Sequence, residues 1–173
     1  MTLVQTVGTF VVALFIPRIV RTIGKKSGYL SLGVVAIVAG AGIALAPAST
    51  PVIALFFFFL LGVGIGGVNT LMWALEADTV EYGEWKTGVR TEGTTYALFS
   101  FTRKMGQAIG GAAGAYALGF VAFSSLAAKN GTPQSADTIR GIQLWSGLLV
   151  TGFILLSLAI MARRRQAAAS GQR

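Results

Sequence analysis

The chain has 173 residues, of which 54% are hydrophobic and only 12% are charged. Soluble domains carry about 25% charged residues, so this composition excludes an ordinary water-facing surface and favours sides that face lipid hydrocarbon. The absence of Cys and His excludes disulfides, zinc sites and catalysis by histidine or cysteine. The net charge of +8 does not indicate nucleic acid, because the basic residues cluster at the ends of apolar runs.

Five apolar segments are long enough to cross a bilayer as helices, which takes about 20 residues. In chain order they cover about residues 3–20, 29–46, 51–77, 94–127 and 142–162. The sequence therefore predicts an all-α, polytopic transmembrane bundle over residues 1–166, followed by a tail at 167–173. We expect no cleavable signal peptide, because the first basic residue, Arg18, follows the first apolar run.

The connections between these segments alternate in charge. The first loop contains Arg18, Arg21, Lys25 and Lys26, the second is uncharged, and the third is densely charged. The fourth holds few charges, and the C-terminal end is basic. By the positive-inside rule the first loop, the third loop and the C-terminus are cytoplasmic, and Met1 lies outside.

One face of the third segment combines small and polar residues. Gly62, Gly66, Asn69 and Trp73 recur at helical spacings of four and three, and Glu76 continues the same face. One interpretation is a packing face whose Asn69 bonds to a neighbouring helix. The other is a cavity wall in which Trp73 stacks against a ligand ring, and the spacing alone does not decide between them.

The fourth segment has a polar face of its own, made of Tyr96, Ser100, Lys104, Gln107 and Gly111. If the span begins at Thr94, Lys104 lies about 15 Å along it, near the middle of the membrane. If it begins at Met105, Arg103 and Lys104 are ordinary cytoplasmic flanks. Both placements fit the sequence. On either, Gly106, Gly110 and Gly114 predict a helix-packing face.

The segment between these two spans carries acids at regular intervals. Asp78, Glu81 and Glu84 repeat every three residues and continue a helical face past the third span. Lys86, Arg90 and Glu92 follow. A solvated linker could have this composition. Acids and bases interleaved at a helix end also suit a salt-bridge latch, and exposed pairs are weak enough to open as well as close.

The run from Asp78 to Gly93, DTVEYGEWKTGVRTEG, followed by Lys104-Met105-Gly106, strongly resembles the glycoside–pentoside–hexuronide:cation symporter family. This family belongs to the major facilitator superfamily, and the segment looks like its connection between helices ten and eleven. The first loop, Arg21 to Lys26, is similar to the weaker basic loop between helices eight and nine. The resemblance implies that the five spans are helices eight to twelve of a twelve-helix protein.

The resemblance also implies residue roles. Lys104 matches a functional lysine near the central cavity. Asp78, Glu81, Glu84 and Arg90 look like the family's cytoplasmic gate, with Lys25 or Lys26 as basic partners. A tryptophan of helix ten can contact the sugar in the family, but its position falls on Asn69, whereas this chain has Trp73 one turn later. The resemblance therefore implies an aromatic platform displaced by one turn in this chain.

We expect this chain to form part of the C-terminal half of a sugar or glycoside symporter driven by Na⁺ or H⁺, in the bacterial cytoplasmic (inner) membrane. Its partners would be lipid, the sugar and the N-terminal helices, with no nucleic acid, metal or other cofactor. The coupling cation would bind mainly to those N-terminal helices. The predicted wall of the sugar cavity comprises Asn69, Trp73, Ser100, Lys104 and Gln107.

Two alternatives remain. The first is a truncated fragment without transport activity of its own, since five helices cannot form the two halves that rock around a central site. The second is a membrane-embedded enzyme or assembly factor. It is disfavoured because the spans contain a lone lysine and amides rather than paired carboxylates or a nucleophile with its base.

Overall fold

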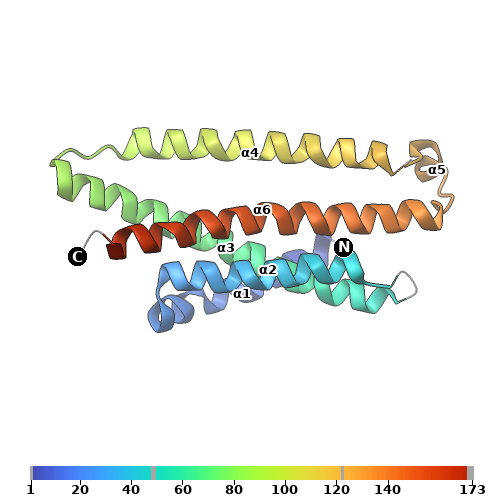
Figure 1. The fold of residues 1–173 in the computed structure, drawn as a ribbon, viewed down its shortest axis with the longest axis horizontal. Helices are drawn as coiled ribbons and strands as arrows, with labels where there is room; N and C mark the ends of the chain where they lie inside the picture. The colour runs from blue at the N-terminus through green and yellow to red at the C-terminus, as the bar shows by residue number, and fades with distance from the viewer. Residues whose placement is uncertain (1, 48–49, 122, 171–173) are drawn as a thin grey trace. The chain divides into compact units, whose positions relative to one another are not determined.

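The computed structural model describes residues 2–47, 50–121 and 123–170, apart from the side chains of Pro51 and residues 163–170. Every regular element in these ranges is helical (Figure 1). The elements are α1 (Thr2–Ile23), α2 (Lys25–Leu45), α3 (Pro51–Thr87), α4 (Glu92–Phe120), α5 (Ser125–Lys129) and α6 (Ala136–Ser170). The predicted all-α bundle is confirmed.

Four described helices are long and apolar enough to cross a membrane: Thr2–Ile23, Lys25–Leu45, Val52–Thr87 and Ala136–Ala162. α4 is also long, with 29 residues, but its glycines, Arg103, Lys104 and Gln107 make it less apolar. The fifth predicted span therefore stays a prediction. The helix of this span ends at Phe120, before the predicted limit at Ala127. The short α5 begins just beyond it, and the side chain of Ser124 caps its first turn by accepting a hydrogen bond from the Ala127 amide.

The chain divides into two compact units. The first contains Met1–Met72 and Gln143–Arg173, and the second contains Trp73–Ile142. Within the first unit, a core of Ala36, Ala39, Ile43 and Leu61 joins α2 to α3, and Val150 and Ile154 of α6 pack against it. Many large apolar side chains stay exposed: Leu3 is 82%, Leu14 80% and Leu45 81% exposed. A surface of this kind suits lipid or further helices rather than water.

Glycines bring α1 and α3 into close contact. A Cβ added at Gly62 would meet the backbone oxygen of Gln5, and one at Gly66 would lie 2.7 Å from Thr9. The Thr9 hydroxyl also donates to the Gly62 carbonyl at 3.2 Å. For Gly62 and Gly66, the packing interpretation of the small-residue face is therefore correct, and their partner is α1.

The contacts of the first unit also give the relative directions of its helices. Gln5 meets Gly62 and Thr9 meets Gly66, so α1 and α3 run parallel. Ala36 meets Gly64 and Leu32 meets Gly67, so α2 runs against α3. α2 also runs against α6, where Gly40 faces Thr151 and Gly33 faces Leu158. The Tyr29 and Ser157 hydroxyls, 2.6 Å apart, add a polar link between these two helices. Such alternation is what consecutive membrane spans require.

Candidate functional site

The second unit is built around a hairpin of α3 and α4. α3 continues past the predicted end of its apolar span at Ala77 to Thr87, so Asp78, Glu81 and Glu84 do extend the helix as their spacing predicts. Gly88 then adopts a φ of 70°, a left-handed conformation that glycine reaches without a steric penalty. Its amide donates to the Glu84 carbonyl at 2.8 Å, which closes the last turn of α3. The chain re-enters a helix at Glu92.

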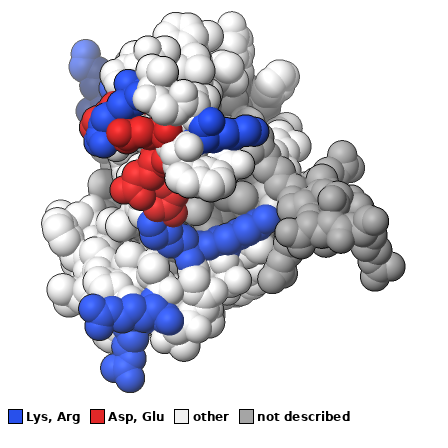
Figure 2. All heavy atoms as spheres, turned by 90° about the vertical axis from the view of Figure 1, so that its left-hand side faces the viewer, with Lys and Arg blue, Asp and Glu red and all other residues white. Residues whose placement is uncertain are grey.

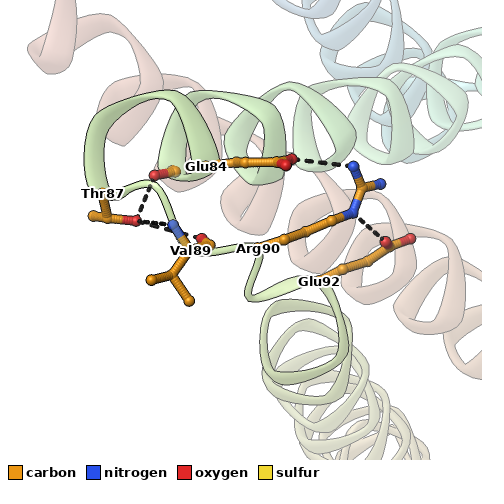
Figure 3. A network of polar contacts seen from close by, with 6 residues as sticks. Glu84, Thr87, Val89, Arg90 and Glu92 are labelled. Atoms are coloured by element: carbon orange, nitrogen blue, oxygen red, sulfur yellow. Dashed lines mark hydrogen bonds and ion pairs between the residues drawn. The ribbon is translucent and has the colours of Figure 1, made fainter.

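Arg90 connects the two arms of this hairpin (Figure 3). Its Nη1 donates to Oε2 of Glu84 at 3.0 Å, and its Nε donates to Oε2 of Glu92 at 2.9 Å. Hydrogen bonding to Glu92, with the charges of both carboxylates, raises the pKa of Arg90 above its usual value. An arginine guanidinium is charged at physiological pH in any surroundings, so the contacts with both carboxylates are ionic. Glu84, Arg90 and Glu92 are called the hairpin bridge below.

The structure brings some of the predicted gate residues together. Glu84 and Arg90 form an ion pair, and Glu92 joins them. Glu81 is exposed on α3 and Asp78 is half-buried. Lys25 and Lys26 open α2, in the other compact unit. All the acidic residues of the chain lie between Glu76 and Asp137, and Figure 2 shows acidic side chains gathered at the end of the molecule where α3 leads into α4.

Trp73 has aromatic and cationic neighbours on α4. Its ring packs edge-to-face against Phe99, with ring centroids 5.1 Å apart. The guanidinium carbon of Arg103 lies 5.2 Å from the centroid of the Trp73 ring. Phe99 and Arg103 are one helical turn apart, so they share the face of α4 that meets Trp73. Trp73 remains 42% exposed. Trp73, Phe99 and Arg103 are called the aromatic clamp below.

The other predicted cavity residues lie on open surface. Ser100, Lys104 and Gln107 share one exposed face of α4, and Lys104 falls near the middle of that helix. Open space surrounds the positions where side chains would start at Gly106, Gly110 and Gly114, so their predicted packing face has no partner among the described residues. Asn69 belongs to the first unit. Its side-chain oxygen is buried without a hydrogen-bond partner in the described part of the chain.

Sequence reasoning missed the clamp because helical periodicity treats each helix alone. The four-residue spacing of Phe99 and Arg103 was visible, but nothing in it indicated Trp73 as their partner. Glu76 is a further buried group: it is 6% exposed, and neither carboxylate oxygen has a hydrogen-bond partner among the described residues. In that same part of the chain, His, Cys, Asp and Glu form no group of three that could hold a metal ion.

Long apolar helices with exposed apolar side chains, together with a charged hairpin, are typical of a polytopic membrane transporter. Residues 1–165 match the family described as "MFS/sugar transport protein". The chain belongs to this family, and it is an integral membrane protein. The resemblance to the glycoside–pentoside–hexuronide type of sugar transporter is thereby confirmed.

Several relatives of the chain carry names that fit a family of transporters. The chain is 45% identical over 159 residues to the glucuronide carrier protein homolog of Escherichia coli, a match that covers 90% of this chain and 33% of the relative. A putative 2,3-dihydroxypropane-1-sulfonate exporter of Salmonella typhimurium is 38% identical over 134 residues, a match that covers 78% of this chain and 28% of the relative. The isoprimeverose transporter of Lactiplantibacillus pentosus is 36% identical over 103 residues, a match that covers 57% of this chain and 20% of the relative.

The relatives' names describe carriers, exporters and transporters rather than enzymes, as the sequence predicted. The chain spans about a third of the length of the glucuronide carrier homologue. No solved structure gave a significant match.

Proposed function

We propose that this chain supplies part of the C-terminal half of a cation-coupled transporter for sugars or glycosides. The family match over residues 1–165 carries this proposal. The alternating directions of α1, α2 and α3 support it, because consecutive helices of a transporter bundle cross the membrane in opposite directions. The coupling ion would be Na⁺ or H⁺, bound mainly by helices outside this sequence.

The mechanism we propose is alternating access, in which two halves of the transporter rock around a central site. Asn69, Trp73, Ser100, Lys104 and Gln107 would form this chain's share of the cavity wall. The exposed face of α4 supports this, because it offers a hydroxyl, an ammonium and an amide in line toward space that the described residues leave open. Hydroxyl-rich substrates are recognised by groups of these types.

The cytoplasmic gate would consist of Asp78, Glu81, Glu84 and Arg90, with Lys25 or Lys26 as basic partners. The hairpin bridge supports this role. It places an ion pair at the tip of α3 and α4, where exposure keeps each contact weak enough to open and close. In this proposal the membrane is the bacterial inner membrane, the hairpin and C-terminus are cytoplasmic, and the start of α1 is outside.

A second possibility is that the chain has no transport activity on its own, because its relatives are about three times longer. A chimera separates the two. In it, this chain replaces the matching third of the Escherichia coli glucuronide carrier homologue. Uptake of labelled glucuronide by cells with the chimera, and none with this chain alone, would support our proposal for the longer protein. A chimera that reaches the membrane at normal levels but never takes up sugar would contradict it.

A further inference from the structure

Arg103 is an unusual residue for the middle of a long helix in a membrane protein. It is half-buried and lies over the Trp73 ring, while Phe99 packs edge-to-face against the same ring. A cation above an indole face is attracted by the negative charge of the ring face. The contact therefore favours this position of the guanidinium.

Arg103 nevertheless has no anionic partner in the described part of the chain. Arg90 pairs with Glu84 and Glu92, whereas no described residue accepts a hydrogen bond from Arg103. A guanidinium is planar, and its five N–H donors point outward from its edges. The contact with Trp73 engages the positive charge and uses none of these donors. If the fourth span begins at Thr94, Arg103 lies inside the membrane, where charged groups are costly without a partner or a water-filled cavity and usually serve a function.

A guanidinium in this position, with free donors, suits one kind of ligand above others. Carboxylate and sulfonate groups present two or three oxygens to which an arginine can donate two parallel hydrogen bonds. Neutral hydroxyls gain less from a guanidinium, because the charge contributes to the strength of the bond. Lys104, the next residue, adds a second positive charge nearby.

We infer that Arg103 is the residue that recognises an acidic group on the substrate, and that the substrate is a sugar or sugar-like polyol bearing a carboxylate or sulfonate. Trp73 holds the guanidinium and offers its exposed part to the ring of the same molecule. This inference rests on the proposed transport function and goes beyond it. Two of the relatives described above carry names that specify such anions, a glucuronide and a sulfonate.

The test compares ligands that differ in one group. Methyl glucuronide and methyl glucoside differ by a carboxylate in place of a hydroxymethyl group, and a 6-sulfonate analogue of the glucoside replaces the carboxylate. Each competes with labelled methyl glucuronide for uptake by the chimera. The variants are Arg103→Gln, Arg103→Lys and, as a matched loss of charge elsewhere, Lys129→Gln. Lys129 is exposed at the end of α5.

We expect the unmodified chimera to prefer the acidic ligands at least about tenfold, the size of effect typical of hydrogen bonds to charged groups. Arg103→Gln should remove this preference while competition by the glucoside stays within about twofold. Arg103→Lys should keep part of it, because lysine keeps the charge but lacks the planar pair of donors. Lys129→Gln should change nothing. Comparing carboxylate with sulfonate shows which acid the site prefers.

Three results would overturn the inference. The unmodified chimera could take both neutral and acidic ligands equally. Arg103→Gln could keep the full preference for acids. Arg103→Gln could also weaken competition by neutral and acidic ligands alike, which would give Arg103 only a structural role in holding α4 against α3. A chimera that transports none of the ligands would instead contradict the proposed function itself, so the two failures are distinguishable.

Discussion

Nη1 of Arg90 lies 3.0 Å from Oε2 of Glu84, so a residue in the turn after α3 is tied back to the last turns of that helix. The same guanidinium reaches Glu92 at the start of α4. Both arms of the hairpin thus depend on one side chain. The partners are 57% and 43% exposed in the Arg90–Glu84 pair, and this exposure gives a latch that costs little to break.

Removing the charge of Arg90 should change transport more than stability. Arg90→Gln leaves Glu84 and Glu92 without their shared partner, so a gate that depends on the hairpin bridge should close less often. We expect uptake by the chimera to fall several-fold, while the thermal unfolding midpoint of the purified chain barely moves, because exposed ion pairs add little stability.

The control exchanges the charges. Glu84→Arg combined with Arg90→Glu restores an attractive pair, although Glu92 then faces a like charge. This double variant should recover part of the uptake that either single change removes. Equal loss in the double variant and in both single variants would show that the ion pair itself is not what matters.

The orientation of the chain can be tested cleanly because it contains no cysteine. Lys86→Cys places a thiol on the exposed end of α3, and Asn130→Cys places one on the exposed segment after α5. With a membrane-impermeant maleimide, we expect Asn130→Cys to react in intact cells and Lys86→Cys to react only in inside-out vesicles. The reverse pattern would refute the proposed cytoplasmic position of the hairpin.

A larger residue at Gly62 should separate α1 from α3. Any Cβ there meets the backbone of Gln5, and backbone cannot move aside as a flexible side chain can. Gly62→Val should therefore destabilise the purified chain in detergent by about 1–3 kcal/mol, the usual cost of overpacking, as measured by thermal unfolding.

Gly152→Val provides the matched control, because the space around Gly152 is open and the residue is exposed on α6. It should unfold at nearly the same temperature as the original chain. If both valines cost the same stability, the close approach of α1 and α3 has no special importance.

The helices were largely readable from the sequence because an apolar run of membrane length leaves few other choices. The runs at 3–20 and 29–46 correspond to α1 and α2. The spacing of Gly62 and Gly66 left a packing face and a cavity wall open, and the structure shows packing. The identity of the partner, α1, could not be read. It depends on which of several apolar helices lies alongside, and hydrophobic periodicity carries no such information.

The candidate site was less predictable for a related reason. Acidic residues every three positions predicted the extension of α3, and the family resemblance implied that Glu84 and Arg90 belong to one gate. The clamp of Trp73 with Phe99 and Arg103 instead depends on how two helices line up across a turn, which the left-handed conformation of Gly88 helps to set. The depth of Lys104 in the membrane depends on neighbours of α4 that the described residues do not include.

The central claim is that this chain forms part of a sugar-transport cavity, and Lys104 tests it most directly. Lys104→Ala removes one exposed ammonium from α4 and should leave folding intact. The measurement is accumulation of labelled sugar by the chimera, with its level in the membrane quantified in parallel. Our account predicts that accumulation is abolished while membrane insertion stays normal. Unchanged uptake by Lys104→Ala would contradict the account.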